Sequence, residues 1–232
     1  VDDKVQDKSH ISGYEELDSL SQKYDIEIFK ASSYKLNDKK CQNFFNENNF
    51  EIAISIGWQR IIPQHVLDTF KQGIFGFHGS CAYLPYGKGR SPLNWSLVLG
   101  DKRFNLNMIK YDKYPDSPNV FSTKTWEITN FDNIRTMQYK NLICSKKQIK
   151  ELFKAYKNNN ITIDRQSNDP EYWYEKRNPE DGKINFSWKT KKIYNLIRAV
   201  THPFPGAFCF LNNAKIFIWD AYPFDKFLDF SD

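Results

Sequence analysis

His78 is the residue of this sequence whose neighbours are best suited to chemistry. The stretch GFHGSCAYLPYGKGRSPLNWSLVLGD, residues 76–101, ends a strand-like run at the histidine and continues into a turn of small residues. Gly79 and Ser80 let the backbone approach a ligand closely. A lone histidine at a strand end is often only a hydrogen-bonded structural group, and that interpretation stays open beside the functional one.

A basic loop and a carboxylate accompany His78. Lys88 and Arg90 alternate with glycines in a loop suited to phosphate, although a solvated surface turn would have the same composition. Asp116 follows the next expected strand, and a carboxylate there can orient an imidazole and stabilise its charge. Together these groups predict acid–base or oxyanion chemistry on a phosphorylated substrate.

The composition limits the classes of protein to consider. The 232 residues carry a net charge of only +5, and the basic residues are scattered, so an anionic small substrate explains them as well as a polyanion does. Four cysteines without paired spacing favour reduced thiols over a disulfide framework or a zinc site. We expect no bound metal, and no apolar stretch reaches the length of a membrane span.

Alternating helices and strands are expected to position these residues. Residue patterns predict helices at 12–25, 36–49, 59–70, 91–100, 140–160 and 187–200, and strands at 26–31, 50–58, 73–80, 104–112 and 120–128. Gly100 is a natural helix end, and Asn212-Asn213 indicates a hairpin turn. This order predicts an α/β fold, Rossmann-like, with a mostly parallel sheet and a small C-terminal helix-plus-hairpin subdomain.

Two domains are expected, a core at residues 1–140 and a helix, loop and small subdomain at residues 141–232. An open parallel sheet usually begins with its central strand, whereas this chain begins with a helix. We therefore expect N-terminal strands to be missing ahead of Val1, as in a truncated or unusually short chain.

Several motifs in this order resemble formyltransferases that use N10-formyltetrahydrofolate. HGSCAYLPYGKGRSPLNWSLVLGD is similar to the HGSLLP, RGRAPLNW and GD signature of that family. YDKYPDSPNV resembles its aspartate loop, and RNPEDGKINFSW and NLIRAVTHPFPGAF resemble its distal segments. The likeness covers about residues 14–224, and it is greater to enzymes that formylate nucleotide-linked amino sugars than to methionyl-tRNA formyltransferase.

The resemblance implies a role for each matching residue. His78 and Asp116 take the positions of the catalytic histidine and the aspartate that tunes it, and Asp112 matches a more structural acid. Ser80, Pro115 and Asp116 are expected to face the formyl donor. Substrate binding is assigned to Arg90, Asn94, Arg177 and Lys88.

The sequence departs from the family at two points near His78. The family has an asparagine that stabilises the oxyanion two residues before the histidine, and here that position is Gly76. Loss of one such donor lowers kcat about 10²–10³-fold in a well-studied hydrolase, so the reaction is either slow or assisted by a water or a backbone N–H. The turn after His78 is also two residues longer than in the family.

The combined expectation is a cytoplasmic, homodimeric enzyme. It would formylate a nucleotide-linked amino-dideoxy sugar, with dTDP-4-amino-4,6-dideoxyglucose as first candidate, for a surface polysaccharide such as the O-antigen of lipopolysaccharide. We expect no nucleic-acid or membrane partner. The alternatives are a folate or nucleotide-sugar binding protein without turnover and, less well supported, a methionyl-tRNA formyltransferase. Tyr172, Trp173 and Tyr174 either stack on a nucleotide base or close the core under a long loop.

Overall fold

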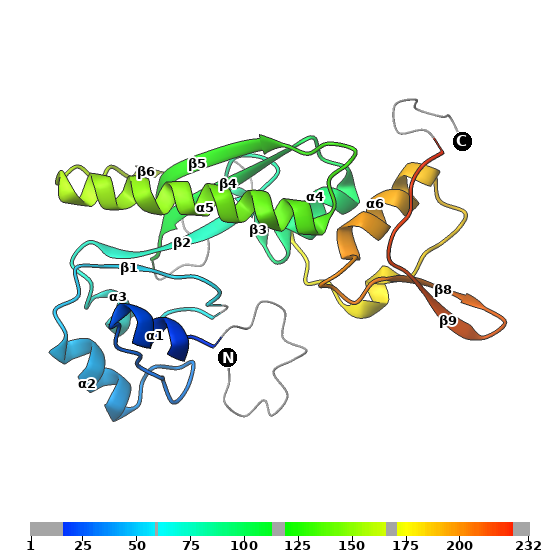
Figure 1. Cartoon of the computed structure of the whole chain (residues 1–232). Coiled ribbons are helices and arrows are strands. Elements are labelled where there is room, and N and C mark those ends of the chain that lie inside the picture. The colour runs from blue at the N-terminus through cyan, green and yellow to red at the C-terminus, as the bar shows by residue number, and fades with distance from the viewer. Residues whose placement is uncertain (1–15, 59, 113–118, 166–170, 225–232) are drawn as a thin grey trace. The chain divides into compact units, whose positions relative to one another are not determined.

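The computed structural model describes residues 16–58, 60–112, 119–165 and 171–224 (Figure 1). The chain divides into two compact units, residues 1–74 and 75–232. Position 140, where we expected a domain boundary, lies inside the continuous helix α5 (Ile134–Lys157).

The first unit is built around aromatic side chains. Its elements are α1 (Asp18–Tyr24), α2 (Lys39–Glu47), β1 (Ile52–Ile54) and α3 (Gln64–Leu67). Phe44 of α2 stacks on Phe29 at 3.8 Å between ring centroids, and Phe50 stacks on Phe70 at 5.1 Å. The strand expected at residues 26–31 is therefore wrong: the segment forms no strand, and Phe29 serves as a packing contact for α2.

The second unit is built around four strands of the large sheet. They are β2 (Gly73–Ser80), β4 (Arg103–Lys110), β5 (Asn119–Glu127) and β6 (Asp164–Arg165), adjacent in that order. The positions of β2, β4 and β5 agree with the predicted strands to within a residue or two. β6 was not predicted, because it falls in the region expected to be a long loop. The α/β fold class is confirmed by the fold comparisons reported below.

The pairings of these four strands differ from the expected parallel arrangement, because β2–β4, β4–β5 and β5–β6 are antiparallel. The connection from β2 to β4 contains only β3 (Tyr86–Gly89) and the eight-residue helix α4 (Pro92–Leu99).

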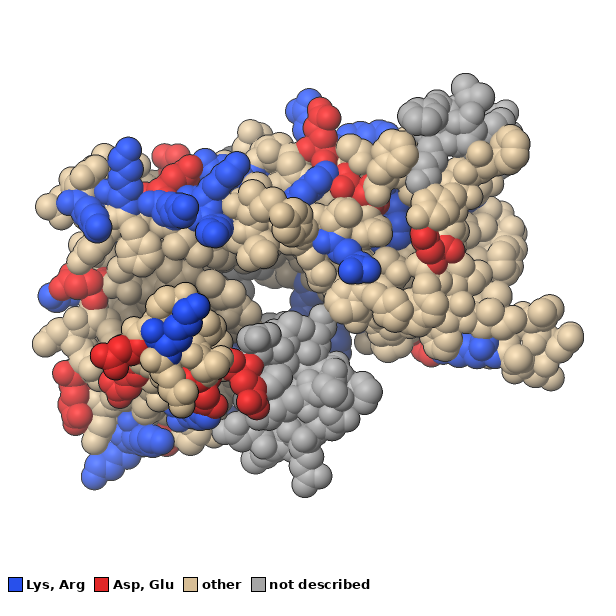
Figure 2. All heavy atoms as spheres, viewed as in Figure 1, with Lys and Arg blue, Asp and Glu red and all other residues tan. Residues whose placement is uncertain are grey.

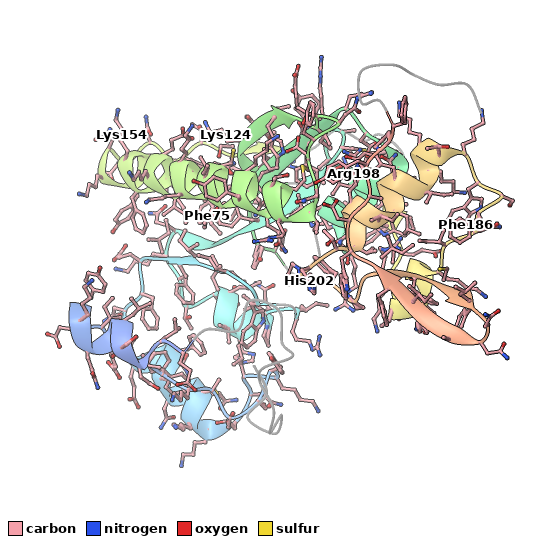
Figure 3. The ribbon with its side chains drawn as sticks, turned by 45° about the vertical axis from the view of Figure 1, so that its right-hand side comes forward. Phe75, Lys124, Lys154, Phe186, Arg198 and His202 are labelled. Carbon is pink, nitrogen blue, oxygen red and sulfur yellow. The ribbon has the colours of Figure 1, made fainter. Side chains whose placement is uncertain are left out.

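One face of this sheet is largely apolar and lies under α5, and we call it the helix-covered face (Figures 1 and 3). The strand register places on it the side chains of Phe75, Phe77, Phe104, Leu106, Met108 and Trp126. Gln148 of α5 is fully buried there and donates hydrogen bonds to the backbone carbonyls of Leu106 and Ser122, at 3.1 and 2.9 Å. The opposite side of α5 is solvated, and Figure 2 shows its lysines gathered along the helix.

In the C-terminal part of the second unit, helix α6 (Thr190–Val200) packs against α4. Arg198 of α6 is buried and donates hydrogen bonds to the carbonyls of Thr129 and Asp132, just ahead of α5 (Figure 3). The predicted hairpin is confirmed as β8 (Ala207–Leu211) and β9 (Ala214–Ile218), with Asn212 and Asn213 at positive φ. Gly100 ends α4 in the left-handed conformation, as predicted.

The region expected to be one long loop contains short ordered elements. β7 (Tyr172–Tyr174) pairs in parallel with β3, and a 3-10 helix, η1, covers Pro179–Gly182. The β3–β7 ladder holds the basic loop of residues 86–90 against residues that lie more than eighty positions later in the sequence. None of the helices in the described part of the chain has both the length and the apolar character needed to cross a bilayer.

Candidate active site

The second face of the sheet, opposite the helix-covered face, carries a row of buried polar side chains. The register places on it His78, Ser80, Asn105, Asn107, Thr123 and Thr125, which we call the polar face. His78, Ser80, Asn105 and Asn107 are each at least nine-tenths buried. Buried polar groups are costly unless they are hydrogen-bonded, so such a row indicates either a structural network or a binding site.

His78 lies near the end of β2, as the sequence predicts, and is 8% exposed. Its Nε2 atom lies 2.9 Å from the carbonyl oxygen of Gly87. A carbonyl only accepts, so Nε2 carries the proton and donates this hydrogen bond. The contact fixes the orientation of the ring.

Asn107 connects His78 to the next two strands. It pairs directly with His78 across β2 and β4, and its Nδ2 atom donates a hydrogen bond to the His78 carbonyl at 3.2 Å. Thr123 of β5 donates to the Asn107 Oδ1 atom at 2.7 Å. Thr125 and Asn105 repeat the same contact, also at 2.7 Å, one step further along the strands. Because each amide oxygen has a hydroxyl donor, the polar face is rigid as well as buried.

The basic glycine-rich loop lies over the end of this face. Ser80 is fully buried and donates its hydroxyl to the Tyr86 carbonyl at 2.5 Å. Gly87 has φ of +84°, and a β-carbon there would overlap the Ser80 Oγ atom and lie 2.9 Å from the Tyr174 ring. Glycine is required at position 87 for both reasons, and its carbonyl is the one that holds His78.

Lys88 is buried and already paired within this loop. Its ammonium contacts the Glu171 carboxylate and lies 5.6 Å from the centre of the Trp173 ring. The hydrogen bond from Lys88 lowers the pKa of Glu171. Lys88 therefore holds the loop to the segment before β7, whereas Arg90 is exposed and available to an anionic ligand.

Arg177 lies against Trp95, an aromatic residue of α4. Its guanidinium lies 5.0 Å from the centre of the Trp95 ring and donates to the Asp181 carbonyl at 3.1 Å. Burial lowers the pKa of Arg177. Trp95 stacks in turn on Tyr174, which is 4% exposed. Of the three aromatic residues considered for base stacking, Tyr174 closes the core.

Tyr172 and Trp173 remain exposed, at 42% and 48% of their surface. The Tyr172 ring stacks on Tyr86 at 4.6 Å between centroids. The side chain of Asn94, by contrast, is buried and donates to the Ala199 carbonyl at 2.7 Å, which ties α4 to α6. This contact gives Asn94 a structural role, and its expected contact with the substrate stays a prediction.

The predicted aspartate partners are only partly visible. Asp112 lies just beyond β4 and is exposed. Pro115 and Asp116 lie outside the described residues, so the pairing of His78 with Asp116 stays a prediction.

Two groups near His78 were missed in the sequence. The first is Tyr111, whose phenol lies directly over Gly76: a β-carbon on Gly76 would overlap its Oη and Cζ atoms and lie 2.6 Å from Cε1. The second is a thiol, phenol and carboxyl cluster in which the Cys81 Sγ atom lies 3.2 Å from the Tyr174 hydroxyl. Burial raises the pKa of Asp101, which the Cys81 thiol contacts. The period-two runs FNLNM and STKT signal the polar face, but a sequence does not say which strands pair.

The comparisons with known proteins decide the family. Residues 6–160 match the family described as "Formyl transferase", and residues 176–229 match "Formyl transferase, C-terminal domain". The chain belongs to the formyltransferase family. His78, the polar face and the basic loop all lie within the first match, and the C-terminal helix and hairpin within the second, so the resemblance read from the motifs is confirmed.

Relatives of known name place the chain within this family. It is 32% identical over 223 residues to the bifunctional polymyxin resistance protein ArnA of Wigglesworthia glossinidia brevipalpis, covering 95% of this chain and 33% of the relative. The chain thus spans about a third of the length of that relative.

Two solved structures share the fold. An N-formyltransferase from Helicobacter canadensis in complex with folinic acid and dTDP-3-aminofucose is 22% identical, with a TM-score of 0.58 over 70% of this chain and 59% of that one. A 4-N formyltransferase from Francisella tularensis is 15% identical, with a TM-score of 0.63 over 78% and 74%.

Proposed function

We propose that this chain moves a formyl group from N10-formyltetrahydrofolate to the amine of a nucleotide-linked amino-dideoxy sugar. The observation that carries the proposal is the family match over residues 6–160, which contains a buried histidine on a polar strand face. The Helicobacter relative was solved with a folate and an amino sugar nucleotide, which supports this pair of substrate classes.

The polar side chains of the described residues are suited to binding a formyl donor. Imidazole, amide and hydroxyl groups line one strand face, and the described residues hold no group of three metal-binding side chains close enough to bind an ion. A carbonyl that gains negative charge is stabilised by neutral or cationic donors of this kind.

The transfer is balanced without an oxidant or reductant. The neutral sugar amine attacks the formyl carbon, a new carbon–nitrogen bond forms, and the bond between the formyl carbon and N10 breaks. One proton leaves the amine and one is taken up by N10, so the products are a formamide and tetrahydrofolate. A base is needed for the first proton and an acid for the second, and we assign both roles to the His78 imidazole.

The other residues divide between donor and acceptor substrates. Arg90 is exposed and would bind the diphosphate, for which its planar fork suits bidentate contact. Arg177 would lie beside the sugar nucleotide. Asp116 would hold the imidazole in the required protonation state, and Ser80 and Pro115 complete the donor side. The first sugar to test is dTDP-4-amino-4,6-dideoxyglucose, with the product serving a surface polysaccharide.

A cytoplasmic homodimer is part of the same proposal. The hairpin β8–β9 exposes apolar side chains that a second copy of the chain would cover, and these are Phe210, Leu211, Ile216 and Phe217. Sedimentation equilibrium of the purified chain tests this part, and a monomer at all concentrations contradicts it.

One observation favours a second candidate, a binding protein without turnover. Gly76 has no side chain where the family has an amide, so one oxyanion donor of the family is missing. Calorimetry with folinic acid and dTDP, followed by a turnover assay, separates the two candidates, because tight binding without product favours the second.

The deciding experiment is a product assay. The chain is incubated with N10-formyltetrahydrofolate and a panel of nucleotide-linked 3-amino and 4-amino sugars, with formate-free blanks and methionyl-tRNA as a further acceptor. We expect mass spectrometry to show a gain of one formyl group on one sugar nucleotide. The absence of a formamide from every sugar nucleotide, including the case in which only methionyl-tRNA is formylated, would overturn the proposal.

A further inference from the structure

Gly76 leaves a space on the polar face that another side chain fills. It lies two residues before His78 on β2, so both positions face the same side of the sheet. A β-carbon built on Gly76 would overlap the hydroxyl oxygen and the Cζ carbon of Tyr111. The end of the phenol therefore occupies the volume in which any larger side chain at position 76 would begin.

The strand register explains how Tyr111 reaches this position. Gly76 pairs with Ile109, and His78 pairs with Asn107. Tyr111 lies two residues beyond Ile109 and one beyond the end of β4 at Lys110, so it continues the alternation on the polar face. Its ring crosses diagonally toward β2, which brings Oη against the Gly76 backbone, about two strand residues, or roughly 7 Å, from the His78 backbone.

The phenol and the side chain it displaces share one chemical property. An asparagine amide and a tyrosine hydroxyl are both neutral hydrogen-bond donors, and both can stabilise an oxygen that becomes negatively charged. Gly76 is necessary for this exchange, because a β-carbon at position 76 and the phenol cannot occupy the same space.

We propose that the Tyr111 hydroxyl acts as the oxyanion donor at this position, hydrogen-bonding the oxygen of the transferring formyl group beside His78. This rests on the proposed formyl transfer. Gly76 and Tyr111 then form a matched pair in which the glycine admits the phenol, and the catalytic donor comes from β4 instead of β2.

The first test removes only the hydroxyl. We expect Tyr111→Phe to lower kcat about 10²–10³-fold with KM nearly unchanged, because the ring still fills the space and only the donor is lost. Tyr194→Phe is the matched control, since the Tyr194 hydroxyl also makes a hydrogen bond, to the Asn130 carbonyl at 2.6 Å, away from the polar face. Equal kcat in Tyr111→Phe and wild type would overturn the inference while leaving formyl transfer established.

The second test displaces the phenol without changing it. Gly76→Ala places a β-carbon where Oη lies, so we expect a loss of kcat similar to that of Tyr111→Phe. The double variant Gly76→Asn with Tyr111→Ala restores an amide donor and space for it, and we expect it to exceed both Gly76→Ala and Tyr111→Ala in rate. A double variant no faster than Tyr111→Ala counts against the exchange.

A third measurement does not depend on turnover. A stable analogue of the donor with a carbon-13-labelled formyl group on N10, such as 10-formyl-5,8-dideazafolate, is bound to the wild type and to Tyr111→Phe, and isotope-edited infrared spectra record the formyl carbonyl stretch. We expect the stretch to lie at lower wavenumber in the wild type, because a hydrogen bond weakens the carbonyl bond. Identical stretches in the two proteins would overturn the inference, and a wild type that does not bind the N10-formyl analogue would overturn the proposed function with it.

Discussion

The two faces of β2, β4 and β5 differ in chemistry although the same backbone forms both. The helix-covered face is largely apolar, and one buried glutamine, Gln148, satisfies backbone carbonyls within it. The polar face carries a histidine, a serine, two asparagines and two threonines whose side chains are hydrogen-bonded to one another or to the backbone. The polar groups of the helix-covered face support its packing. On the polar face, by contrast, polar side chains recur along all three strands, and those on β2 and β4 are buried. Such repeated burial of polar groups is typical of functional sites.

The largest effect is expected from His78 on the polar face. His78→Ala should lower kcat for formyl transfer by about 10²–10⁴-fold, because it removes the acid–base group. His65→Ala is the control, since the His65 Nε2 atom also contacts a backbone carbonyl, that of Leu36, at 3.0 Å. Rates are measured by formamide formation. Equal loss in both variants would show a general structural effect and contradict the distinction between the faces.

A substitution on the helix-covered face should change the stability of the protein but not kcat. Gln148→Ala removes the hydrogen bonds to Leu106 and Ser122 and leaves a cavity, so we expect the free energy of unfolding to fall by about 2–4 kcal/mol. Urea unfolding measures this change, and kcat per folded molecule should stay at the wild-type value. Lys147→Ala, on the exposed side of the same helix, should change neither quantity.

Asp132, just ahead of α5, provides a test of how protein stability depends on pH. Burial alone would raise the pKa of Asp132, but hydrogen bonds from Lys140, Thr129 and Thr136 outweigh it and lower the pKa. The stability contributed by Asp132 is therefore fully present above the unfolded pKa of about 4, and it is lost as the pH falls through the lower folded value.

Asp132→Asn should reduce the free energy of unfolding at pH 7 by about 1–3 kcal/mol. The difference from the wild type should shrink as the pH falls below about 4, as followed by urea unfolding across that range. A difference that stays constant with pH would show that Asp132 acts through packing and not through its charge.

The smallest effect is expected from Thr123, which supports Asn107 from β5. Thr123→Val keeps the shape of the side chain and removes the hydrogen bond to the Asn107 amide oxygen, so stability should fall by about 1 kcal/mol. Because Asn107 contacts the backbone of His78, kcat should fall a few-fold as well. Thr123→Ser, which keeps the hydroxyl, should recover both, and a serine variant as weak as valine would contradict this account.

Local structure was largely predictable from the sequence, whereas the pairing of the strands was not. The strand that carries His78, the helix end at Gly100 and the hairpin turn at Asn212-Asn213 each depend on a short pattern, and each was predicted correctly. The direction of β4 relative to β2 was not predicted correctly, because the same alternation of helices and strands is compatible with parallel and antiparallel neighbours.

The candidate site divides in the same way. His78 and Arg90 stand out by type and spacing, and Arg177 stands out only through the resemblance to the family. Burial of Lys88 and Asn94 depends on partners far along the chain, at Glu171 and Ala199. Tyr111 has no motif of its own, and its closeness to Gly76 follows only from the register of β2 against β4.

The central claim is that the formyl donor binds on the polar face beside His78. The four histidines of the chain give four imidazole Cε1–H signals, which His→Ala variants assign, and a titration with folinic acid follows them by heteronuclear NMR. The account predicts that the His78 signal shifts in a saturable manner while those of His65 and His202 stay in place. Saturable binding of folinic acid with an unmoved His78 signal would contradict it.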